Sequence, residues 1–130
     1  MRLLLDTQCW LWMRVSPERF SERARELIVE AQVPLLLSAA SSWEMSVKYA
    51  LGKLPLPEPP AAYVPKRLRE DGITGLAVSH AHALRVAELP AHHRDPFDRL
   101  LVAQAQCDRL TLLTADRVLT GYDVEIVWAG

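Results

Sequence analysis

The sequence lacks any apolar run long enough to cross a membrane, and it has no repeat, low-complexity tract or Gly/Ser-rich linker. Asp6 interrupts the first apolar stretch before a secretory signal could form. The chain has only 2 cysteines, Cys9 and Cys107, without C-x-x-C spacing, which favours reduced thiols over a disulfide scaffold. These absences predict a cytoplasmic protein with no membrane partner.

The sequence also has almost no excess of charge, with a formal net charge of −1. No field of the whole protein would therefore attract nucleic acid, and a polyanion would have to be held locally by a metal or a basic patch. With 130 residues, of which 50% are hydrophobic, the chain is large enough for one core. We expect a single domain over residues 1–130.

Short apolar runs alternate with segments of helical periodicity. The runs predict buried strands at 2–5, 34–38, 73–79, 110–114 and 124–128, and the other segments predict helices at 7–15, 21–32, 39–52, 61–71, 80–89 and 96–109. Pro65 is expected to interrupt the fourth helix. Apolar strands that alternate with helices favour a mostly parallel sheet covered on both faces, so the predicted fold is a three-layer α/β/α sandwich with about five strands.

Four carboxylates fall where the carboxyl ends of such strands would meet. Asp6 ends the first strand, Glu44 lies about two turns into the helix after the second, and Asp116 follows the fourth. Asp98 lies in the first turn of the helix that leads into the fourth strand. Ligands bind at this edge of open parallel sheets, so these side chains are candidates for one site.

Each acid alone also has an ordinary structural interpretation. An Asp after a strand is usually a cap or turn residue, and Glu44 could simply pair with Lys48 one helical turn later. Several carboxylates at one edge repel each other, however, unless a cation lies among them. Carboxylates without clustered Cys or His favour Mg²⁺ or Mn²⁺ over zinc, and such a site suits phosphodiester cleavage.

The segment "HHRDPFDRLL" at 92–101 contains two aspartates with different expected roles. Asp95 followed by Pro96 is a favoured helix start, so Asp95 is expected to be the N-cap. Asp98 then occupies the third helical position, where the helix dipole favours the ionised carboxylate, and is the expected ligand. His92 and His93 could contact a phosphate group, but we expect them to form a solvated loop pair.

Four segments in this order resemble the motifs of PIN-domain proteins, particularly the VapC ribonuclease toxins: "LLLDTQCWLW", "SAASSWEMSVKYALGKL", "HHRDPFDRLLVAQA" and "LTLLTAD". The resemblance implies a Mg²⁺-dependent endoribonuclease, with Mn²⁺ possible, that forms a homodimer and is inhibited by a VapB-type antitoxin. It places the four acids of the family on Asp6, Glu44, Asp98 and Asp116, as catalytic and metal residues. Thr7, Lys48 and Thr114 are the expected supporting or substrate-binding residues, and RNA is the expected substrate.

Other classes of protein fit the sequence less well. A receiver-type phosphoacceptor domain would need a pair of acids after the first strand and an Asp after the third, where Ser79 stands. A phosphatase with an aspartyl nucleophile would need Asp-x-Asp where the sequence has Asp6-Thr7-Gln8. A non-catalytic PIN-like binding module is disfavoured by the complete set of acids. A PIN nuclease of RNA maturation stays open as the alternative to a toxin.

Overall fold

A five-stranded sheet forms the centre of the computed structural model, which describes all 130 residues. Its strand order is β3-β2-β1-β4-β5, and every neighbouring pair is parallel. The predicted parallel sheet is therefore confirmed. None of the helices has both the length and the apolar character needed to cross a bilayer. The strands are β1 Leu3–Leu5, β2 Leu35–Ser38, β3 Thr74–Leu76, β4 Thr111–Thr114 and β5 Ile126–Trp128.

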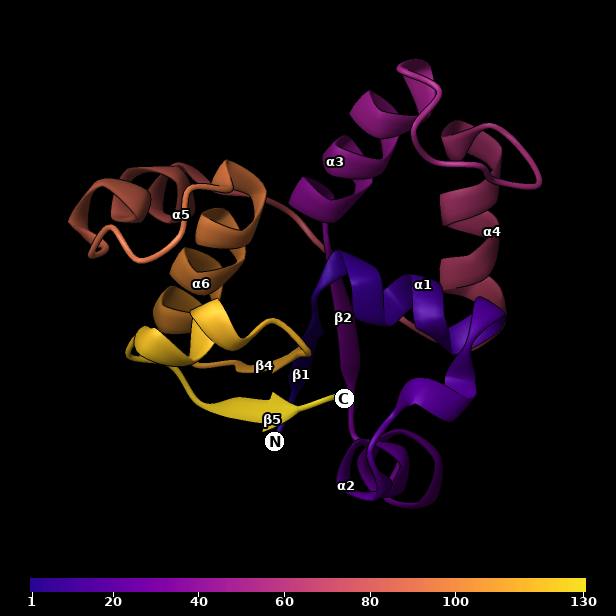
Figure 1. Ribbon diagram of the computed structural model, residues 1–130, viewed down its shortest axis with the longest axis horizontal. Coiled ribbons are helices and arrows are strands. Elements are labelled where there is room, and N and C mark those ends of the chain that lie inside the picture. The colour runs from indigo at the N-terminus through magenta and orange to yellow at the C-terminus, as the bar shows by residue number, and fades with distance from the viewer.

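Helices cover both faces of the sheet, as predicted for a three-layer sandwich (Figure 1). Successive strand residues point to opposite faces, so Leu4 belongs to the core cluster under α6, whereas Leu5 belongs to the cluster under α1 and α4. The helix α3 lies between these two layers, above the carboxyl ends of the strands (Figure 1). The helices are α1 Thr7–Val15, α2 Glu22–Arg25, α3 Ala39–Ala50, α4 Pro60–Asp71, α5 His80–Arg85 and α6 Pro96–Asp108.

The helix α2 begins at a serine cap, and the expected break of the fourth helix at Pro65 is wrong. Ser21 accepts a hydrogen bond from the Ala24 amide at the start of α2, which continues into one π-helical turn at Glu26–Glu30. The helix α4 runs unbroken through Pro65. Because this proline is exposed and lies in the second turn, only a carbonyl near the solvated helix start loses its intrahelical partner.

The sheet topology creates a crevice between β1 and β4. From β1 the chain adds β2 and β3 on one side, and then crosses to add β4 and β5 on the other. The strand order therefore reverses beside β1. The connections that follow β1 and β4 lead away from each other, which leaves space above the carboxyl ends of these two strands. Ligands bind at this kind of switch point in open α/β sheets.

A candidate metal centre at the carboxyl edge of the sheet

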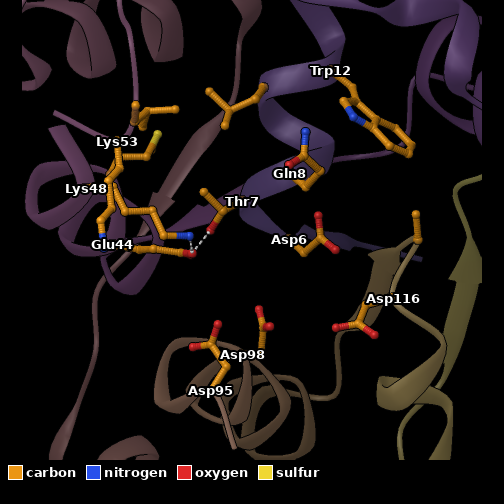
Figure 2. Close-up of a pocket in the computed structure, with 14 residues that line it drawn as sticks. Asp6, Thr7, Gln8, Trp12, Glu44, Lys48, Lys53, Asp95, Asp98 and Asp116 are labelled. Atoms are coloured by element: carbon orange, nitrogen blue, oxygen red, sulfur yellow. Dashed lines mark hydrogen bonds and ion pairs between the residues drawn. The ribbon is translucent and has the colours of Figure 1, made fainter. Parts of the chain in front are cut away.

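The four acids predicted from the sequence come together around one cavity of about 490 Å³ (Figure 2). Asp6 comes from the end of β1, Glu44 from α3 and Asp98 from the start of α6, and Asp116 follows β4. The cavity is also lined by Thr7, Lys48 and Asp95, and by Lys53, which the sequence did not single out. Residues more than 100 positions apart in the chain thus form a single acidic site.

Asp6 is both a helix cap and a wall of the cavity. Its Oδ1 accepts a hydrogen bond of 2.7 Å from the Cys9 amide at the start of α1. Its Oδ2 accepts one of 2.5 Å from the hydroxyl of Thr114, at the end of the neighbouring β4. Burial is the main cause that raises the pKa of the Asp6 carboxyl, and the Thr114 hydrogen bond opposes it. The structural and functional interpretations of Asp6 are therefore compatible.

Glu44 is held by two of the predicted supporting residues. The Thr7 hydroxyl donates to Glu44 Oε1 over 2.7 Å and lies 2.9 Å from Ser41 Oγ. Lys48 Nζ donates to the other carboxylate oxygen over 2.6 Å, which raises the pKa of Lys48. Because only 5% of Glu44 is exposed, these partners offset the cost of burying its charge.

The two aspartates of "DPFD" occupy the positions expected of them. Asp95 Oδ1 accepts a hydrogen bond of 2.8 Å from the Phe97 amide and so caps α6. Asp98 lies in the first turn of this helix, with 19% of its side chain exposed. Burial, followed by the negative charges of Asp95 and Glu44, raises the pKa of Asp98 to about 7. The expectation that the helix dipole keeps Asp98 ionised is therefore wrong, because burial and the neighbouring charges oppose its ionisation.

His93 is a site residue that sequence reasoning missed. Its Nε2 lies 2.9 Å from Asp116 Oδ2 and 3.2 Å from Asp98 Oδ2. Only 18% of the side chain is exposed, so the expected solvated pair with His92 is wrong for His93. The loop that ends at the Asp95 cap folds back over the start of α6. The nearness of His93 to "DPFD" was visible in the sequence, but the direction of its ring was not.

The donor set suits a hard divalent cation. Carboxylate oxygens from four separate segments face the cavity, and neither cysteine lines it. Carboxylate clusters of this kind bind Mg²⁺ or Mn²⁺, whereas thiolates and multiple imidazoles select zinc. A cation would also oppose the effects of burial and of the neighbouring negative charges, which together raise the pKa of Asp98.

We expect the stability of the cation-free protein to fall as the pH rises through the titration of Asp98. Its pKa is about 7 in the folded state against 3.8 for the unperturbed group, so between these values the folded chain keeps a proton that the unfolded chain has lost. Melting curves with and without Mg²⁺ measure this. Mg²⁺ should raise the melting temperature more at about pH 7.5 than at about pH 5.5, because the cation competes with that proton.

The variant Asp98→Asn is the control for this pH dependence, because its amide cannot titrate. It should show a smaller change in melting temperature between the two pH values and a smaller response to Mg²⁺. Equal responses to Mg²⁺ in both proteins at both pH values would contradict the assignment of Asp98 to a cation site.

Comparisons with known proteins show what the chain is similar to. The family model of the PIN domain matches residues 3–125. Ribonuclease VapC16 of Mycobacterium tuberculosis (strain ATCC 25618 / H37Rv) is 52% identical over 58 residues, which are 45% of this chain and 41% of that relative. The matched segment thus spans about two fifths of the relative's length.

Two solved structures have the same fold over almost the whole chain. VapBC2 from Rickettsia felis, bound to a DNA fragment from the promoter, superposes with a TM-score of 0.72 at 14% identity, covering 100% of both chains. DNA-bound VapBC from Salmonella typhimurium gives a TM-score of 0.71 at 18% identity, covering 98% of this chain and 97% of the other. At such low identity these likenesses establish the fold alone.

Proposed function

The chain belongs to the PIN-domain family, and from this premise we propose that it is a metal-dependent endoribonuclease, the toxin of a VapBC-type toxin–antitoxin pair. The observation that carries the proposal is the cavity in which four carboxylates from separate segments meet (Figure 2). The 52% identity with a ribonuclease VapC over part of the chain supports RNA as the substrate. We further propose that residues 1–130 act as a single nuclease domain.

In this proposal Asp6, Glu44, Asp98 and Asp116 hold Mg²⁺, with Mn²⁺ as a substitute. A divalent cation bound there activates water and neutralises negative charge on the phosphate. Among the supporting residues, Thr114 fixes Asp6 by its hydrogen bond, and Thr7 and Lys48 fix the two oxygens of Glu44. Such hydrogen bonds from neighbouring groups orient ligating carboxylates.

Lys53 is the cation best placed to meet the RNA backbone. It lines the cavity and is exposed, and it forms no ion pair within the chain, whereas Lys48 is already paired with Glu44. An exposed ammonium group that lines an acidic cavity would attract a phosphate, and because it is positively charged it would not bind the metal cation. We propose that Lys53 contacts a phosphate next to the cleaved bond.

We predict products with a 5′-phosphate and a 3′-hydroxyl. The oxygen of water attacks the phosphorus, the P–O3′ bond breaks, and the departing O3′ takes a proton. Attack by the 2′-hydroxyl would need a free general base at the scissile bond, but His93 already contacts two carboxylates and His92 packs against Tyr122. Ligation of adaptors to the new ends distinguishes the products, and a 2′,3′-cyclic phosphate would refute hydrolysis by water.

The proposed activity is tested by incubating the purified chain with total RNA in Mg²⁺, in Mn²⁺ and in excess EDTA. Cleavage at internal sites should occur with either cation and stop in EDTA. The variant Glu44→Gln, purified in parallel, is the control for a contaminating nuclease. Equal cleavage in EDTA, or by both proteins, would overturn the proposal.

A VapB-type antitoxin is the proposed partner, and a homodimer is the proposed assembly. Structures with this fold are of VapBC complexes, which supports the first. Trp43 and Val47 on α3 and Leu51 at its C-cap are exposed apolar residues spaced four apart, which supports a protein contact on that helix. Growth arrest on expression, relieved by the product of a small neighbouring gene, distinguishes a toxin from a nuclease of RNA maturation.

A further inference from the structure

We propose that His93 is a positioning residue: its Nε2 donates to Asp116 and contacts Asp98, and this bridge holds both carboxylates in the arrangement that binds the cation. The inference rests on the proposed metal site and adds a residue to it. The two aspartates come from different segments, α6 and the turn after β4, so nothing in the backbone alone keeps their side chains together. The His93 ring is the group that joins them.

The hydrogen-bond partner of Nδ1 fixes which ring nitrogen carries the proton. Nδ1 lies 3.0 Å from the backbone nitrogen of Asp95, which can only donate, so Nδ1 accepts this bond and carries no proton. The proton of the imidazole is therefore on Nε2, which donates it to Asp116 Oδ2 and lies 3.2 Å from Asp98 Oδ2. A neutral ring with the opposite tautomer would direct a lone pair at two acceptor oxygens.

The tautomer of His93 decides whether this residue positions the carboxylates or binds the cation itself. Nε2 and the carboxylate oxygens of Asp98 and Asp116 lie within 4.8 Å of one another, close enough for a shared ion. A nitrogen that carries a proton has no lone pair for a cation, however, and the Asp95 amide holds the proton on Nε2. His93 therefore acts through the carboxylates.

The loop that carries His93 is fixed before any ligand arrives. The backbone amide of His93 donates to the hydroxyl of Tyr122 over 2.9 Å. Arg99 donates to the same hydroxyl over 3.2 Å and to the Pro90 carbonyl over 2.9 Å. Because Tyr122 is almost fully buried, with 4% exposed, its hydroxyl has a fixed position and holds the backbone of His93 in place. The ring of His93 thus has little freedom to leave the two aspartates.

The direction of the effect follows from this arrangement. The N–H dipole lowers the repulsion between the two carboxylates, and the 3.2 Å contact on Asp98 Oδ2 leaves Oδ1 of the same residue without a protein partner. One oxygen of Asp98 is thereby turned to the bridge and the other is available for the cation. Removing the bridge leaves two repelling carboxylates that the cation must order by itself.

Calorimetric titration with Mn²⁺ at constant pH tests the proposal on wild type, His93→Ala, His93→Gln and His92→Ala. We expect His93→Ala to weaken Mn²⁺ binding about 10- to 100-fold, the usual cost of losing such a partner. Glutamine carries an N–H group at about the position of Nε2, so His93→Gln should recover most of the affinity. His92 packs on Tyr122 away from the two aspartates, so His92→Ala should bind Mn²⁺ like wild type.

The outcomes separate the alternatives. Normal Mn²⁺ affinity in His93→Ala, with or without a lower melting temperature, would overturn the proposal and leave the metal site intact. If wild type does not bind Mn²⁺, the role of His93, the metal site and the proposed function are all overturned. Co²⁺ absorption spectra complete the test: they should match in wild type and His93→Gln, whereas a difference would identify His93 as a ligand and overturn the positioning role.

Discussion

Asp98→Asn should lower the rate of RNA cleavage on the order of a hundredfold or more, because the variant loses one charged ligand of the cation that promotes hydrolysis. The change is nearly isosteric, and it removes a carboxyl whose ionisation is opposed by burial and by the negative charges of Asp95 and Glu44. The variant should therefore fold at least as well as wild type. High Mg²⁺ should restore part of the rate, since weakened binding is a loss by mass action. Initial rates at low and high Mg²⁺, with melting curves, measure this.

Asp95→Asn is the matched variant three residues earlier. Asparagine caps a helix about as well as aspartate, so its side-chain oxygen can accept the same hydrogen bond from the Phe97 amide. We expect a change in stability of about 0.5 kcal/mol or less and most of the activity. A folded but inactive Asp95→Asn, or an Asp98→Asn that cuts RNA normally, would show that the cap and the ligand are assigned the wrong way round.

Arg67→Ala should destabilise the fold by about 3 kcal/mol, which is the usual scale for removing one partner of a buried charged network. Arg67 is 1% exposed, and its guanidinium lies 3.8 Å from the centre of the Trp10 ring. It also donates to the Trp10 carbonyl over 2.9 Å and lies 3.5 Å from Asp71. The variant loses this stacking and leaves a void between α4 and α1. Denaturant unfolding at neutral pH measures the change.

Arg69 is the control, because it lies on the same helix but is exposed. Arg69→Ala should change the free energy of unfolding by about 0.5 kcal/mol or less. Arg67→Met refills much of the volume without a buried charge, so its loss should be smaller than that of Arg67→Ala. If Arg67→Ala and Arg69→Ala unfold at the same denaturant concentration, Arg67 is not part of the core.

The fold could be predicted from local patterns because each strand and helix carries its own signal. The helix at 7–15 was predicted with the bounds that α1 has, since an acid and a polar residue precede its apolar face. The edge strands were predicted too long: residues 73–79 contain only β3, Thr74–Leu76. An edge strand ends where its single neighbour stops pairing, and this depends on β2 rather than on the local sequence.

The candidate site was predictable in its acids but not in the contacts between them. A parallel sheet brings the ends of β1 and β4 together, so Asp6 and Asp116 could be placed at one edge from their positions in the chain. The hydrogen bond from Thr114 to Asp6 and the bridge made by His93 depend on side-chain directions set by tertiary packing. For the same reason, Arg67 could not be recognised as buried within a basic run.

A crystal structure of the protein grown with Mn²⁺, with anomalous diffraction measured at the manganese edge, tests most directly whether the acidic cavity is a metal centre. The difference map should show a peak between Asp6, Glu44, Asp98 and Asp116, with carboxylate oxygens at about 2.0–2.3 Å from the ion. His93 Nε2 should stay in contact with the carboxylates and outside the coordination shell. A cavity without a peak in crystals that bind Mn²⁺ elsewhere, or a peak ligated by His93, would contradict this arrangement.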